Sequence, residues 1–254
     1  MVLNTPNTWV FLRGLTRESG HWGSFARDFE ASIPGSRVVC IDIPGNGHLC
    51  AQRSPLTVQV MRDACRDQLV AMGIPAPYGL FGMSMGAMVA LSWCSAYAKE
   101  VNACVLVNSS MKPFSRFYER LKPANYLQLF RLALLPSTDE KWERAILNMT
   151  STVKDEAVLP GWLGLRQQHP VTRLNAVRQL WAASRFCAPA QPTSVPTLVL
   201  TSDGDELVDS RCSYAMAQHW HLPLQIHPHA GHDLALDDGA WAIEKVSQWL
   251  ADLH

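Results

Sequence analysis

Six short apolar runs, each followed by a turn signal, set the strongest limit on how this 254-residue chain can fold. The runs are continuous rather than alternating, which is typical of strands covered on both faces of a parallel sheet. Between and after them, apolar residues recur at helical spacing, as in residues 58–71 and 241–250. Repeated strand–helix units with short loops predict an open, doubly wound α/β sheet. The predicted strands lie at residues 9–12, 38–41, 78–81, 103–107, 197–200 and 224–226.

One long segment interrupts this pattern. No strand is predicted between Asn108 and Pro196, and residues 111–188 have a helical pattern that several prolines break. Strands resume afterwards, so the segment reads as an insertion rather than an independent domain. We therefore predict a helical cap at 111–188, inserted into an α/β core formed by residues 1–110 and 189–254.

Composition and charge argue against several classes of function. The chain is 48% apolar and 17% charged, its formal net charge is zero, and no Lys/Arg-rich run suggests nucleic acid as a partner. No apolar run approaches the roughly 20 residues that span a bilayer, and residues 1–9 lack the pattern of a signal peptide. Seven scattered cysteines without a CxxC pair indicate reduced thiols. We expect a cytoplasmic protein without a membrane partner; the sequence leaves the oligomeric state undefined.

The segment from Gly82 to Gly86 reads Gly-Met-Ser-Met-Gly and fits the G-x-S-x-G pattern of a nucleophilic serine. It follows a predicted strand and precedes a predicted helix. A sharp turn there holds Ser84 in a strained conformation, and the flanking glycines let strand and helix approach closely. The side-chain oxygen then projects at a helix N-terminus, which favours developing negative charge. A serine in an ordinary glycine-rich turn is the alternative.

A serine needs a base within hydrogen-bond reach to act as a nucleophile at neutral pH. His232 is the candidate base because it lies in an Ala-Gly-His-Asp loop after the last predicted strand and before the final helix. Four histidines precede it and are interpreted as surface or loop residues: His219, His221, His227 and His229. His227 and His229 could form a metal pair, but no third ligand of suitable spacing follows.

The acid that orients the base is expected after the penultimate strand, where three carboxylates compete. They are Asp203, Asp205 and Glu206. Asp205 is favoured because the apolar pair 207–208 follows it and would bury against the core, which would hold the loop. The other aspartate is expected to shape the turn.

With these residues in place, the chain resembles the α/β-hydrolase superfamily over nearly its whole length, and is most similar to compact cap-bearing esterases such as the pimeloyl-carrier-protein methyl ester esterases. Five ordered motifs carry the resemblance: Arg13-Gly14-Leu15, residues 42–47 (Asp-Ile-Pro-Gly-Asn-Gly), residues 82–86, residues 203–208 and residues 230–233. The resemblance implies a mostly parallel, doubly wound sheet, of which this chain is expected to have about six strands. It also implies that the backbone amides of Leu15 and Met85 form the oxyanion hole. The chain departs from the family at two points: Arg13 stands where the family usually has histidine, and the first predicted strand begins near residue 8, where the superfamily usually has two further strands before it.

The predicted cap carries an excess of positive charge, with twelve Lys/Arg against six Asp/Glu in residues 111–188. Lys112, Arg116 and Arg120 are spaced by four, which predicts one helix face. This stripe is either an ordinary solvated face or a surface that steers an anionic substrate or an acidic carrier protein. Several large side chains are candidates for an acyl pocket, although ordinary packing explains the aromatic ones equally well; they are Met83, Met85, Met111, Phe114, Phe117, Trp162 and Trp181.

These observations predict a cofactor-independent carboxylic ester hydrolase that acts through an acyl-enzyme on Ser84, with His232 as base and Asp205 as its partner. No metal is expected. Two alternatives remain: the same triad used for thioester or C–C bond hydrolysis or for a lyase reaction, and a non-catalytic binding module on the same scaffold.

Overall fold

A parallel six-stranded sheet in the order β2-β1-β3-β4-β5-β6 forms the centre of the computed structural model, which describes residues 6–134 and 137–253. Every neighbouring pair of strands runs parallel. All six predicted strands are confirmed, extended by at most two residues at either end. Their bounds are β1 Thr8–Leu12, β2 Arg37–Ile41, β3 Tyr78–Met83, β4 Val101–Val107, β5 Thr197–Ser202 and β6 Leu224–His227.

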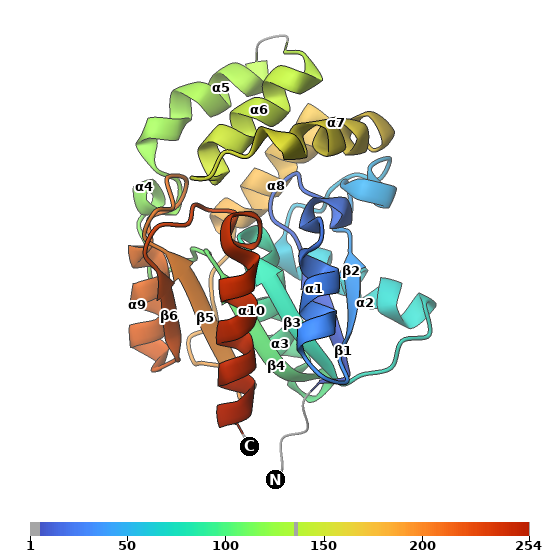
Figure 1. Ribbon diagram of the computed structural model, residues 1–254, viewed down its shortest axis with the longest axis vertical. Coiled ribbons are helices and arrows are strands. Elements are labelled where there is room, and N and C mark those ends of the chain that lie inside the picture. Colours follow the sequence, from blue (N-terminus) through green and yellow to red (C-terminus); the bar gives the residue numbers. More distant parts are fainter. Residues whose placement is uncertain (1–5, 135–136, 254) are drawn as a thin grey trace.

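Helices cover both faces of the sheet, which is why the strands are apolar without alternation. On one face lie α1 (Phe25–Ser32) and α10 (Leu234–Asp252), packed on an aromatic cluster that includes Phe11, Phe29 and Phe81. On the other face lie α2 (Val58–Ala71), α3 (Met85–Ala96) and α9 (Arg211–Trp220) (Figure 1). Ten of the twelve residues of α3 are buried, which makes it the central helix of its layer.

Side-chain hydrogen bonds explain where several helices begin. The Thr57 hydroxyl accepts a hydrogen bond from Val60 N–H and so caps α2. The helix begins at Val58, as predicted. The C-terminal helix begins earlier than predicted, at Leu234. It is interrupted at Asp238, whose backbone is not helical. The Asp238 carboxylate accepts a hydrogen bond from the N–H of Trp241, the first residue of the helix predicted at 241–250.

The segment between β4 and β5 forms helices α4 to α8, which we call the cap, and no strand of the sheet among its described residues. The cap lies beyond one end of the sheet (Figure 1). Lys112 and Cys187 form an isolated parallel bridge, and Ala188 N–H donates to Lys112 O at 2.7 Å, so the segment begins and ends side by side. The cap helices are α4 Phe117–Arg120, α5 Tyr126–Leu134, α6 Asp139–Thr150, α7 Leu159–Gln168 and α8 Arg173–Arg185.

The predicted basic stripe on one cap helix face is wrong. Helix α4 comprises only Phe117–Arg120, Arg116 is its N-cap, and Lys112 lies in the bridge described above, so the three cations do not share a helix. Arg120 turns inward and donates to the carbonyls of Ala183 and Ser184. A spacing of four predicts a shared face only inside a continuous helix, and only the last of these three residues lies in one.

All seven cysteines are free. No helix within residues 6–134 and 137–253 combines the length and apolar character that crossing a membrane requires. The prediction that residues 1–9 do not form a signal peptide concerns a segment that lies partly outside the described residues.

Candidate active site

Ser84 occupies a sharp turn between β3 and α3. Its backbone has φ 56° and ψ −118°, a left-handed conformation that costs a non-glycine residue free energy. Two glycines make the turn possible: a Cβ at Gly82 would lie 2.5 Å from Gly86 O, and one at Gly86 would lie 2.1 Å from Leu12 O. Ser84 N–H donates to Val107 O at 2.9 Å, which ties the turn to β4. The predicted strand–serine–helix geometry is therefore present.

His232 and Asp205 form a buried pair, with His232 Nδ1 and Asp205 Oδ2 2.7 Å apart. The histidine is 4% exposed and the aspartate 2% exposed. The second oxygen, Oδ1, accepts from the amides of Leu207 and Val208 at 2.8 and 2.9 Å. The residues that follow Asp205 thus hold its carboxylate with their amides, which orients it toward the imidazole.

The competing carboxylates point elsewhere. Asp203 is exposed and accepts a hydrogen bond from the Tyr214 hydroxyl at 3.0 Å. Glu206 is exposed, and its carbonyl accepts from Asn125. The structure therefore places Asp205, and neither of its neighbours, against His232.

The pKa of His232 is raised from its ordinary value by the balance of opposing effects. Burial disfavours the charged imidazolium, but the Asp205 carboxylate favours it through its charge and its hydrogen bond. Asp233 adds to this effect, whereas Arg13 opposes it. An imidazole in this environment is suited to accept a proton and to be stabilised in its charged form by Asp205.

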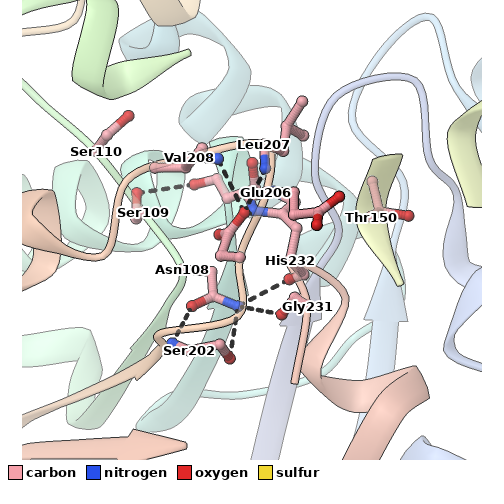
Figure 2. A network of polar contacts seen from close by, with 12 residues as sticks. Asn108, Ser109, Ser110, Thr150, Ser202, Glu206, Leu207, Val208, Gly231 and His232 are labelled. Atoms are coloured by element: carbon pink, nitrogen blue, oxygen red, sulfur yellow. Dashed lines mark hydrogen bonds and ion pairs between the residues drawn. The ribbon is translucent and has the colours of Figure 1, made fainter. Parts of the chain in front are cut away.

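Asn108, which directly follows β4, holds the histidine loop in place and was missed by the sequence analysis as a site residue. Its side-chain amide donates to the carbonyls of His232 and Gly231 at 2.9 and 3.2 Å, and its oxygen accepts from Ser202 N–H at 2.9 Å (Figure 2). The next residue, Ser109, donates to Ser84 O at 3.0 Å. Two consecutive residues therefore connect the serine turn and the histidine loop. The only sequence signal was a polar residue at a strand end.

The Ser84 side-chain oxygen forms no hydrogen bond to any residue in the part of the chain that the structure describes. No hydrogen bond therefore joins Ser84 and His232 directly in this structure. Catalytic hydrogen bonds are often long without substrate and shorten in the reacting complex.

The two predicted oxyanion-hole amides belong to residues next to the serine turn. A Cβ at Gly14 would lie 3.0 Å from Ser84 Cβ, so the loop that carries Leu15 lies against the serine. Leu15 N–H has no hydrogen-bond partner among the described residues, which leaves it free for a ligand oxygen. Met85 is the first residue of α3, where amides lack acceptors within the helix.

Arg13, the residue that departs from the family pattern, pairs with Asp233 beside the candidate base. Two hydrogen bonds of 3.1 and 2.6 Å join the guanidinium and the carboxylate, and both side chains are buried. Burial alone would raise the pKa of Asp233, but the Arg13 charge and hydrogen bonds hold it below its ordinary value. The pair connects the loop after β1 with the loop that carries His232.

We expect Arg13→Met to lower the free energy of unfolding by about 3–5 kcal/mol, because it leaves Asp233 buried without its partner. Urea unfolding measures the change. The matched control is Arg27→Met, since the Arg27–Asp28 pair is 80% and 49% exposed and surface pairs contribute at most about 1 kcal/mol. Equal losses in the two variants would contradict a structural role for the buried pair.

The residues predicted to line an acyl pocket do not gather in one place. Phe117 and Trp181 are 73% and 52% exposed, and Phe114 packs against the Trp220 ring of α9. The others are buried in three separate clusters: Met83 in the first, Met85 and Met111 in the second, and Trp162 in the third. The Trp162 ring lies under the Arg17 guanidinium, 4.2 Å from it. Side-chain type alone does not say where in the fold these residues lie. The substrate contact expected of them stays a prediction.

No group of three or more His, Cys, Asp or Glu side chains that could hold a metal ion is found among the described residues. His227 instead contacts Asp238, and its Nδ1 accepts from the amides of His229 and Ala230.

The sheet order, the serine turn and the buried His–Asp pair are typical of the α/β hydrolases. Comparison with known families identifies the same class. Residues 9–244 match the alpha/beta hydrolase family. The chain belongs to this family.

Its relatives in sequence are distant. The chain is 26% identical to the pimeloyl-[acyl-carrier protein] methyl ester esterase of Nitrosomonas europaea over 241 residues, covering 88% of this chain and 87% of that protein. It is 22% identical to the human monoacylglycerol lipase ABHD6 over 263 residues, covering 96% of this chain and 75% of that protein.

Solved structures share the fold. The enol-lactonase of Burkholderia xenovorans aligns with a TM-score of 0.78 at 17% identity, covering 98% of this chain and 92% of that one. A thermophilic esterase of Thermogutta terrifontis aligns with a TM-score of 0.74 at 19% identity, covering 97% and 90%. At such identities the likeness defines the fold only.

Proposed function

We propose that this protein is a serine hydrolase that cleaves carboxylic esters through an acyl-enzyme intermediate. The observation that carries the proposal is the buried 2.7 Å hydrogen bond between His232 and Asp205, on loops tied to the Ser84 turn through Asn108 and Ser109. The sequence relatives named as an esterase and a lipase support the same class of reaction.

In the proposed reaction, His232 Nε2 accepts the proton of the Ser84 hydroxyl while its oxygen adds to the ester carbonyl. The amides of Leu15 and Met85 stabilise the oxyanion of the tetrahedral intermediate. His232 then donates its proton to the departing alcohol, which leaves the acyl group on Ser84. A water activated by His232 hydrolyses this ester and restores the serine. Asp205 stabilises the imidazolium in both halves, and no cofactor takes part.

A fluorophosphonate probe tests the proposal directly, because it labels serines that a base has activated. We expect stoichiometric labelling at Ser84, located by peptide mass spectrometry, and turnover of p-nitrophenyl esters. An unlabelled wild-type protein without esterase activity would overturn the proposal and favour a binding module on this scaffold.

A substrate panel separates esterase chemistry from the rivals that use the same residues. We expect kcat/KM to be higher for p-nitrophenyl esters of varied chain length than for acyl thioesters or cyanohydrins. A methyl ester linked to acyl-carrier protein, compared with the free methyl ester, tests whether the positively charged cap recruits an acidic carrier. A preference for the linked ester that is present at low salt and lost at high salt would support carrier-linked esters as the substrate class.

The acid limb of the pH profile provides an independent check on His232. The base must be neutral to accept the serine proton, so kcat/KM should rise with pH through the pKa of His232 in the free enzyme. Because that pKa is raised, we expect the midpoint to lie above about 6.5, the ordinary value for histidine. Asp233→Asn should move the midpoint downward, since it removes a carboxylate that favours the imidazolium and leaves Arg13 unneutralised. A midpoint below the ordinary value in the wild type would contradict this assignment.

A further inference from the structure

Helix α8 of the cap buries two amide side chains beside its buried alanines and exposes several large apolar ones, unlike an ordinary surface helix. Gln179 is 0% exposed and Asn175, one turn earlier, is 3% exposed, whereas Leu174, Val177 and Trp181 are each more than half exposed. Burying an amide costs free energy unless its hydrogen bonds are made inside the protein. The buried face of α8 must therefore be explained by what the two amides bind.

Gln179 binds the loop that follows β1. Its oxygen Oε1 accepts from Thr16 N–H at 2.8 Å, and its nitrogen Nε2 donates to Asn46 Oδ1 at 2.7 Å and Ser54 Oγ at 2.9 Å. Asn46, itself fully buried, donates to Arg17 O at 2.9 Å. Two consecutive residues of the loop are thus held by a pair of amides, one of which comes from the cap.

This loop needs external support. Thr16 has φ 59°, a left-handed conformation that costs a threonine free energy and persists only where the surroundings hold it. The turn is closed by one weak bond, from Arg17 N–H to Gly14 O at 3.2 Å. Leu15, between Gly14 and the strained residue, carries the free amide described above. The conformation of Thr16 therefore sets the direction of the peptide groups on either side of Thr16. The first of them, which contains the Thr16 N–H, is joined through the Leu15 Cα to the peptide group that carries the Leu15 N–H.

We infer that Gln179 is a positioning residue for the oxyanion hole: by holding Thr16 N–H from the cap, it fixes the Leu15 amide beside Ser84. The inference rests on the proposed function, because it needs an oxyanion to form at this place. A cap residue then contributes to the chemical step without touching the substrate. Its loss should lower kcat more than it changes KM, since the amide acts on the charge that develops in the transition state.

The test compares two buried amides on the same helix face. Gln179→Met keeps the side-chain length and removes all three hydrogen bonds. We expect it to lower kcat by about 10²-fold, the lower end of the loss seen when one oxyanion donor is removed. Affinity for a trifluoromethyl ketone, whose adduct with Ser84 forms an oxyanion, should fall by a similar factor, while KM for a p-nitrophenyl ester stays near the wild-type value.

Asn175→Leu is the matched control. Asn175 accepts from Ser54 N–H and donates to Gln52 O. It therefore anchors α8 to residues 52–54, which Gln179 also reaches through Ser54, but it makes no hydrogen bond to the loop of Thr16. This variant should lower Tm as Gln179→Met does but keep the ketone affinity near wild type. Gln179→Glu keeps an acceptor for Thr16 N–H and should recover part of the lost kcat.

Equal losses of kcat and ketone affinity in Gln179→Met and Asn175→Leu would overturn the inference, because a loosened cap would then explain both. A change in KM alone would also overturn it. Failure of the proposed function is distinct, since it would appear as wild-type protein that neither hydrolyses esters nor reacts with a fluorophosphonate at Ser84.

Discussion

Replacing Ser84 with alanine is expected to reduce kcat for ester hydrolysis by about 10⁶-fold, the loss that follows removal of the nucleophile in a serine protease triad. The fold should survive. Alanine carries the same Cβ through the left-handed turn as serine does, and the Ser84 oxygen has no hydrogen bond in the described part of the chain that the change would remove. Steady-state kinetics with a p-nitrophenyl ester, with Tm as the measure of folding, gives the result.

The matched control is Ser92→Ala, which removes a buried serine hydroxyl from the helix that begins at the serine turn. Ser92 accepts from Arg62 at 3.1 Å and lies two turns beyond Ser84, so its loss should affect stability rather than turnover. Activity of Ser84→Ala within tenfold of the wild-type value would show that another group is the nucleophile.

Replacing Asp205 with asparagine should reduce kcat by about 10⁴-fold, the loss known for the same change in a serine protease. An asparagine oxygen can still accept from the amides of Leu207 and Val208, which preserves the loop. Its NH₂ group then faces His232 Nδ1 and stabilises the tautomer that has its proton on Nε2. That tautomer cannot accept a proton from Ser84. The measurement is kcat for the same ester.

Asp203→Asn provides the control in the same loop. Asp203 is exposed and contacts the Tyr214 hydroxyl rather than His232, so kcat should stay close to the wild-type value. A larger loss in Asp203→Asn than in Asp205→Asn would show that the buried aspartate is not the partner of the base.

The sequence was most informative where a physical requirement is local. Strands covered on both faces are continuous apolar runs, and all six were predicted within two residues. The glycines at 82 and 86 are dictated by the close approach of strand and helix at Ser84. The choice of Asp205 was anticipated from the two apolar residues that follow it, although it is their amides that hold the carboxylate.

Inference from spacing failed where it assumed a regular element that is absent. Lys112, Arg116 and Arg120 would share a face in a continuous helix. Instead, Lys112 lies in an isolated bridge, Arg116 is the N-cap residue of α4, and Arg120 ends that four-residue helix. The pocket residues show a related limit of sequence reasoning, and their contact with substrate stays a prediction. Side-chain type indicates that Phe117 or Trp181 favours an apolar environment, but not which neighbours supply one.

Fold class, the order of the strands along the chain and the identity of the candidate serine, acid and base were determined by the sequence, because each depends on residues close together in the chain. Tertiary structure alone decided which groups support them. Arg13 and Asp233 are 220 residues apart, Gln179 and Thr16 are 163 apart, and Asn108 and His232 are 124 apart. The parallel sheet brings the carboxyl ends of its strands to one edge. Periodicity reports which face of an element is buried but carries no information on partners that only this assembly brings together.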